Sequence, residues 1–413
     1  MVSRRKFLQS GSMAMTVCLL SRGMSLGRSP SLATGSIDDY IQEKMLEFHI
    51  PGMTLSVIKN NQIHWIKGFG WADLENKIPM DPSQSIQNIG SISKTITATA
   101  VMQLMEKQKI QLDDDINTFL NFSVRNPRFP DIPITFRQLL SHRSSIMDGD
   151  AYGQSYKCGD PAVSLESWMQ DYFIPNGKFY DPDGHFHIWK PGEEGPLPAV
   201  PRSYSNVGFG LLGYLVEVIS GIPFEEYTRK HIFEPLGMTQ TGWFIKDIDR
   251  SHHVTPYTYM SDNMELPPGF TYEMALPKYP EEQTPLTPGT YFPHCLYSFY
   301  NFPDGLLRTS ARELSYFMNC YMGGGIYRGN RILEEKTVQM MYQPAYPSDI
   351  TRGLCWDISG INDQRFFGHG GGDPGVNTSM YFNPEDRKGI IILTNCSNAD
   401  LYGLMAYILG ELG

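Results

Sequence analysis

The stretch Asn88-Ile89-Gly90-Ser91-Ile92-Ser93-Lys94-Thr95 opens an apolar segment that continues to Met105. The pattern predicts a helix, and positions i and i+3 share a helix face, so Lys94 is expected beside Ser91. A serine hydroxyl is a poor nucleophile until a neighbouring base takes its proton. A lysine can be that base if its pKa is lowered, and Ile92 and Ile96 make burial the expected cause. At the start of a helix, the backbone N–H of Ser91 would also serve as half of an oxyanion hole.

Short motifs of this kind recur by chance in the same chain. A second S-x-x-K lies at Ser3–Lys6, a second Y-x-N at Tyr381–Asn383, and G-x-S-x-G at Gly23–Gly27, ahead of any strand–turn–helix elbow. The order of several motifs is therefore more informative than Ser91 and Lys94 alone.

Four further motifs follow in a fixed order. They are Ile134-Thr135-Phe136-Arg137-Gln138-Leu139-Leu140-Ser141-His142, Tyr204-Ser205-Asn206-Val207-Gly208-Phe209-Gly210, Pro235-Leu236-Gly237-Met238 and Gly368-His369-Gly370-Gly371-Gly372-Asp373-Pro374-Gly375. With the Ser91 motif, this set resembles the β-lactamase-related serine hydrolases, which include class C β-lactamases, D,D-peptidases, D-aminopeptidases and certain esterases. The resemblance runs from about residue 37 to the C-terminus.

The resemblance implies a role for each matching residue. Ser91 would attack a carbonyl and become acylated, while Lys94 and Tyr204 move the proton to the leaving group and later activate water. Asn206 would bind Lys94 or the substrate amide. The third motif would supply His369 as a catalytic residue, Gly370 and Gly371 as substrate-binding residues, and the N–H of Gly372, with that of Ser91, as the oxyanion hole. No metal and no organic cofactor is implied.

Two positions depart from the family pattern. His369 stands where β-lactamases usually place a lysine for the substrate carboxylate, which favours the esterase, amidase and peptidase branches over a penicillinase. A neutral imidazole could still donate to a bound carboxylate or stabilise Tyr204. Ser145 replaces an expected glycine and is predicted to alter only a turn.

The segment 148–203 is longer than expected and rich in aromatic residues. Aromatic side chains beside a pocket would form a lid or an apolar substrate wall. A separate cluster packed on its own side chains is an equally open reading. His185-x-His187 within it lacks a third ligand and is expected at the surface.

The resemblance implies a β-lactamase/transpeptidase-like fold, an α/β part with an all-α part. The local patterns agree, since strand-like runs gather near both ends of the chain and helical ones in the middle. An antiparallel sheet built from both termini, flanked by helices, is therefore expected. The sheet part would span about 37–110 and 350–413, with a helical insert at about 111–349, in one hydrolase domain over 34–413.

Residues 1–33 resemble a twin-arginine export signal. Arg4 and Arg5 precede a modestly apolar stretch, and small residues would allow cleavage after Ala33. A periplasmic or secreted location is therefore predicted.

No other stretch approaches the ~18 apolar residues of a membrane span. Residues 34–413 carry 29 basic and 44 acidic residues, and this acidic balance argues against nucleic acid. A monomer that binds a small-molecule or peptide substrate is expected.

Five cysteines remain after residue 33, with wide spacings and no C-x-x-C. Proteins exported by the twin-arginine route fold in a reducing compartment, which favours free, buried thiols. We therefore expect no disulfide.

Three functions are compatible with this sequence. The first is an exported serine hydrolase that cleaves an ester or amide, peptide-like bond, with cell-wall or D-amino-acid peptides as candidate substrates. The second is an acyltransferase that passes the acyl group to an amine or alcohol. The third is a slowly acylated penicillin-binding or sensor protein.

Overall fold

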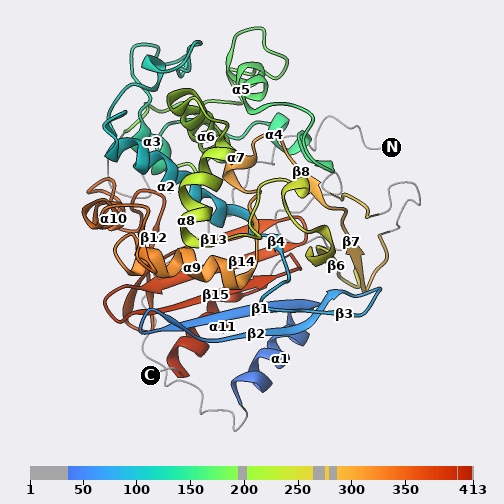
Figure 1. Cartoon of the computed structure of the whole chain (residues 1–413). Coiled ribbons are helices and arrows are strands. Elements are labelled where there is room, and N and C mark those ends of the chain that lie inside the picture. The colour runs from blue at the N-terminus through green and yellow to red at the C-terminus, as the bar shows by residue number, and fades with distance from the viewer. Residues whose placement is uncertain (1–35, 194–201, 264–274, 279–285, 398, 412–413) are drawn as a thin grey trace, which may run out of the picture.

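A computed structural model describes residues 36–193, 202–263, 275–278, 286–397 and 399–411. The predicted export signal at residues 1–33 lies outside these ranges. Strands from both ends of the chain form a seven-stranded sheet in the order β12-β13-β14-β15-β1-β2-β3, and every neighbouring pair is antiparallel (Figure 1). The expected β-lactamase/transpeptidase-like fold is confirmed.

The strands of this sheet follow the alternating or apolar runs of the sequence. Their bounds are β1 Gly52–Lys59, β2 Gln62–Asp73, β3 Ile78–Pro79, β12 Asp357–Ile361, β13 Gln364–Asp373, β14 Val376–Asn383 and β15 Lys388–Thr394. The central strands β1 and β15 are buried on both faces, which explains their nearly continuous apolar character.

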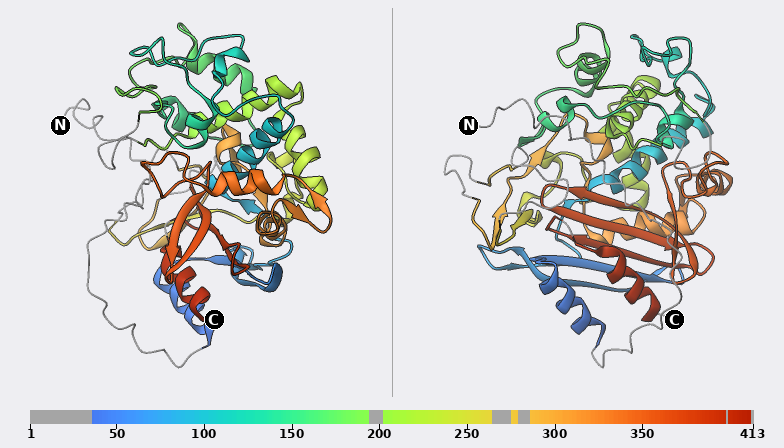
Figure 2. Two further views of the ribbon diagram at one scale, coloured as in Figure 1. Left: turned by 90° about the vertical axis from the view of Figure 1, so that its left-hand side faces the viewer. Right: turned by 180° about the vertical axis from the view of Figure 1, so that it is seen from behind.

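Helices α1 (Ile37–Glu47) and α11 (Leu401–Glu411) lie side by side on one face of the sheet, as the rear view in Figure 2 shows. Ser36 caps α1 by a capping box with Asp39. The two helices bury an apolar layer against β1 and β15, which includes Ile41, Leu55, Ile392 and Leu404.

The helical region covers the other face. It contains α2 (Ser93–Glu106), α3 (Phe136–Leu140), α4 (Asp150–Gln154), α5 (Leu165–Phe173), α6 (Asn206–Ser220), α7 (Phe224–Thr228), α8 (Glu234–Leu236), α9 (Ala311–Met322) and α10 (Glu335–Tyr342). Helix α9 packs against β1 and β15, and α2 packs against α6. The main core therefore lies between the sheet and these helices.

Residues 148–193, the larger described part of the aromatic segment 148–203, contribute to this core. Trp168, Tyr172, Phe173 and Phe186 are buried within the main apolar cluster. These four rings therefore do not form a separate cluster, and they are not an exposed lid. The expectation of a surface histidine pair is wrong for His185, which is buried and stacks on Tyr172 with ring centroids 3.6 Å apart.

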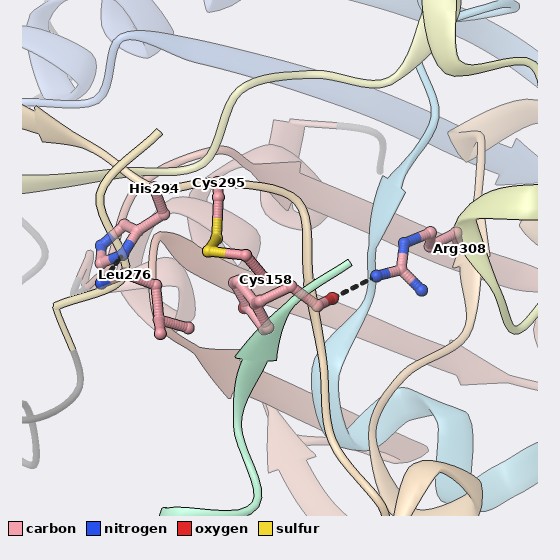
Figure 3. Close-up of a disulfide and its surroundings, with 6 residues drawn as sticks. Cys158, Leu276, His294, Cys295 and Arg308 are labelled. Carbon is pink, nitrogen blue, oxygen red and sulfur yellow. Dashed lines mark hydrogen bonds between the residues drawn. A yellow bond between two sulfur atoms is a disulfide. The ribbon is translucent and has the colours of Figure 1, made fainter. Parts of the chain in front are cut away.

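The prediction of free cysteines is wrong for two of the five. Cys158 and Cys295 form a disulfide across a sequence separation of 137 residues (Figure 3). It links β5 (Lys157–Cys158) to the segment just before β8 (Tyr297–Ser298), the strand with which β5 pairs. Such a wide spacing gives no local signal, because only the fold brings the two sulfur atoms together. Cys320, Cys355 and Cys396 are buried free thiols, as expected.

Within the described residues, no single helix is long and apolar enough to cross a membrane, although α6 and α7–α8 reach that length together across an 80° bend.

Candidate active site

Ser91 lies just before helix α2 rather than inside it. Gly90–Ile92 form a 3₁₀ turn, and α2 begins at Ser93. The hydroxyl of Ser93 donates to the carbonyl of Gly90 at 2.6 Å and fixes this turn. Gly90 has φ +53°, a conformation that favours glycine, and it packs against Gly371 and Gly372 of β13. The turn therefore holds Ser91 next to the glycine-rich strand.

The Lys94 amine reaches Ser91, as the i, i+3 spacing predicts. Lys94 Nζ lies 3.0 Å from Ser91 Oγ and is fully buried. It donates to Asn206 Oδ1 at 2.7 Å and to the carbonyl of Asp304 at 2.8 Å. These two acceptors bind two of the N–H groups of the amine. The third position on the nitrogen, a lone pair or a third N–H, is directed toward Ser91 or the Asp304 carboxylate.

Burial alone would lower the pKa of Lys94, as expected from the sequence. The net direction is nevertheless upward, because Tyr204, Asp304 and Asp148 outweigh desolvation and raise the pKa of Lys94. The expectation of a lowered pKa is therefore wrong. The carboxylates responsible come from segments that carry no recognisable motif in the sequence.

Tyr204 lies over the amine, with Lys94 Nζ 4.9 Å from its ring centroid. Burial raises the pKa of the Tyr204 hydroxyl, against the lowering effects of Lys94 and Ser91, so the hydroxyl is neutral at pH 7. The ring stacks on His142, with centroids 4.2 Å apart. His142 accepts the N–H of Ser205 at Nδ1, 3.1 Å away, and so helps to position the residue after Tyr204.

Asp148 fixes Asn206 at the start of α6. It accepts the backbone N–H groups of Asn206 and Val207 and, at 2.9 Å, the side-chain amide nitrogen of Asn206. The amide is thereby oriented with its oxygen toward Lys94. Sequence reasoning missed Asp148, because it lies 58 residues before Asn206 and no local pattern links the two.

His369, Gly370, Gly371 and Gly372 all lie on β13, and His369 is buried 6.4 Å from Tyr204 between ring centroids. Burial lowers the pKa of His369 to about 4, so the ring is neutral at pH 7. Its Nδ1 lies 2.5 Å from the carbonyl of Gly370, which can only accept. Nδ1 therefore carries the proton and Nε2 is an acceptor, so neutral His369 cannot donate from Nε2 to a carboxylate.

At the glycine-rich end of β13, no described strand pairs with the edge opposite β14. Strand β12 pairs only with residues 364–368, while residues 367–373 pair with β14 on the other side. Gly372 is exposed, and a Cβ added there would meet no described atom within 4 Å. Among the described residues, no three His, Cys, Asp or Glu side chains gather as a metal site.

The predicted residues thus converge from three separate parts of the chain. A family model described as Beta-lactamase matches residues 37–409. The chain belongs to the Beta-lactamase family. Together with its fold, this identifies the protein as a serine hydrolase of the β-lactamase type, as the motifs predicted.

Individual relatives are distant. "Putative penicillin-binding protein PbpX" of Bacillus subtilis is 26% identical over 84% of this chain and 71% of its own length. An octameric penicillin-binding protein homologue from Pyrococcus abyssi is 25% identical, with a TM-score of 0.70 over 91% of this chain and 76% of that one. A D-amino acid amidase from Ochrobactrum anthropi has the same TM-score at 20% identity, over 91% and 96% of the two chains, and supports the fold alone. The expected monomer stays a prediction.

Proposed function

We propose that this protein cleaves an ester or amide, peptide-like bond through an acyl-enzyme on Ser91. The observation that carries this proposal is the buried Lys94 amine, 3.0 Å from Ser91 Oγ and held by Asn206 and Asp304. When the Lys94 amine is free, Lys94 and Tyr204 take the serine proton as Oγ attacks the carbonyl, and they return it to the leaving group. Because the pKa of Lys94 is raised, the share of molecules with a free amine grows as the pH rises.

The oxyanion hole is proposed at the N–H groups of Ser91 and Gly372. The close packing of Gly90 on Gly372 supports this role, because it holds the two segments together. The backbone edge opposite β14, beside Gly370 and Gly371, would pair with an extended, amide-containing acyl group. That edge favours a peptide-like substrate, and the fold is shared with a D-amino acid amidase.

The test is intact-mass spectrometry and turnover with three reagents: penicillin, a p-nitrophenyl ester and a D-amino acid anilide. An adduct or turnover that disappears in Ser91→Ala supports the acyl-enzyme. Ser167→Ala, which removes an exposed hydroxyl on α5, is the matched control and is expected to behave as wild type. Equal behaviour of wild type and Ser91→Ala with all three reagents would contradict the assignment.

We also propose export from the cytoplasm. The twin-arginine pattern of residues 1–33 supports it. The Cys158–Cys295 disulfide supports an oxidising destination, and in a protein that folds in the reducing cytoplasm this bond would form after export. Replacing Arg4 and Arg5 by lysine is expected to retain the protein in the cytoplasm. Unchanged fractionation of that variant would exclude the twin-arginine route.

A further inference from the structure

A buried chain of polar side chains in contact begins at Lys94 and leads away from Ser91. Asp304 Oδ2 lies 3.3 Å from Lys94 Nζ, and both side chains are almost fully buried. The Tyr152 hydroxyl donates to the same Asp304 oxygen at 2.9 Å. Asn301 Nδ2 donates to the other oxygen, Oδ1, at 2.8 Å. The carboxylate is therefore fixed from three sides.

The chain continues through a second tyrosine to a second acid. The hydroxyls of Tyr152 and Tyr156 are in contact at 3.3 Å, and Tyr156 donates to Asp373 Oδ1 at 2.8 Å. Because each hydroxyl has one proton and gives it to a carboxylate, the contact between the two oxygens carries no hydrogen bond of its own. Asn88 donates to Asp373 Oδ2 at 2.8 Å and also accepts the N–H of Gly90 at 2.7 Å. The chain thus runs from the lysine to the strand and the turn that flank the nucleophile.

This chain gives the aromatic segment a specific role. Tyr152 and Tyr156 come from it, and its Trp168 donates to Asn301 at 2.9 Å, which in turn holds Asp304. Cys158 follows Tyr156 by two residues, and its disulfide to Cys295 ties this part of the segment to the residues just before β8.

We propose that Asp304 is the counter-ion that positions the Lys94 amine and sets its charge, and that Tyr152, Tyr156 and Asp373 keep this counter-ion in place. This inference rests on the proposed function of Ser91 and Lys94. Asp304 acts through Lys94 and is therefore a positioning residue. Its negative charge stabilises the ammonium that forms when Lys94 takes the proton of Ser91.

The direction of the effect on pH dependence follows from the charges around the amine. The titratable groups that face Lys94 or Asp304 from the surrounding elements are Tyr204, Asp148, Tyr152, Tyr156, Asp373, and the neutral His142 and His369. Asp304 raises the pKa of Lys94, while burial raises the pKa of Asp304 itself to about 6, so it is largely ionised at pH 7. Removing its charge would lower the pKa of Lys94 and yield the free amine at lower pH.

The test measures how fast a fluorophosphonate labels Ser91 between pH 5 and 10. In this reaction Ser91 Oγ bonds to phosphorus, fluoride leaves, and Lys94 takes the serine proton, so the rate reports activation of the nucleophile without a natural substrate. In Asp304→Asn, the acidic limb of the rate profile is expected to move to lower pH by one unit or more, a tenfold relative gain on that limb.

If Asp304→Asn does not fold, Tyr152→Phe provides a second variant for the same measurement, because it removes the hydroxyl that donates to Asp304. Loss of its donor makes the Asp304 carboxylate less ionised, so the limb should move in the same direction by a smaller amount. Tyr172→Phe is the matched control, because its buried hydroxyl lies on the same segment but contacts Met147 and Gly149 instead.

The outcomes separate the two proposals. Labelling of Ser91→Ala equal to wild type would overturn the proposed function. Labelling that requires Ser91, with profiles of Asp304→Asn and Tyr152→Phe that fall equally at every pH, would overturn the role of Asp304 alone. A purely structural role predicts that uniform loss.

Discussion

Gly90→Ala tests whether contact between the Ser91 turn and β13 builds the oxyanion hole. A Cβ added at Gly90 would lie 2.8 Å from the backbone nitrogen of Gly372 and 3.0 Å from the carbonyl carbon of Gly371. Both neighbours are backbone atoms and cannot rotate away. The turn and the strand must separate by about 0.6 Å to restore an ordinary van der Waals contact.

The expected loss of activity is larger than the loss of stability. The left-handed φ at Gly90 costs about 1–2 kcal/mol when a Cβ is present. Misplacing one oxyanion donor costs about 10²-fold or more in kcat, or roughly 3 kcal/mol of transition-state stabilisation. Gly221→Ala is the matched control, because Gly221 has φ +72° and open space around the added methyl group.

The assay compares kcat on a p-nitrophenyl ester with the free energy of unfolding in urea for both variants. Both variants should lose the stability that the left-handed φ costs, and Gly90→Ala should lose more because of its backbone clash. Only Gly90→Ala should lose about 10²-fold in kcat. If Gly90→Ala retained activity within about threefold of Gly221→Ala, the proposed oxyanion hole at Gly372 would be refuted.

Two further predictions concern stability. Replacing both Cys158 and Cys295 by serine should lower the free energy of unfolding by about 2–5 kcal/mol, because the disulfide closes a 137-residue separation; identical urea curves with and without the disulfide would contradict this. Burial lowers the pKa of His294 to about 3 in the folded protein, against about 6.5 in the unfolded chain. As the pH falls, the unfolded chain therefore binds a proton before the folded protein does, and the free energy of unfolding decreases below about pH 6.5. Urea unfolding at pH 7 and at pH 4 gives the stability lost between these pH values, and His294→Gln should reduce that loss by about 3 kcal/mol. An unchanged loss would show that His294 is protonated in the folded protein.

The sequence alone determined the nucleophile region and the sheet. The i, i+3 spacing of Ser91 and Lys94 is a local property of a helical turn, so their contact could be predicted without a fold. Strand patterns near both termini likewise predicted one sheet, because apolar runs such as β1 and β15 must pair where both faces are buried.

Only the tertiary structure decided the direction in which the pKa of Lys94 shifts and the pairing of Cys158 with Cys295. Asp304 lies 210 residues from Lys94 in the chain, and Cys295 lies 137 residues from Cys158. Neither pair has a spacing rule, because such contacts depend on where whole helices and loops pack. Burial of Lys94 was predictable from its apolar neighbours. The carboxylates of Asp304 and Asp148, which together with Tyr204 outweigh the effect of burial on that pKa, were not, since they come from segments that the fold alone brings to the site.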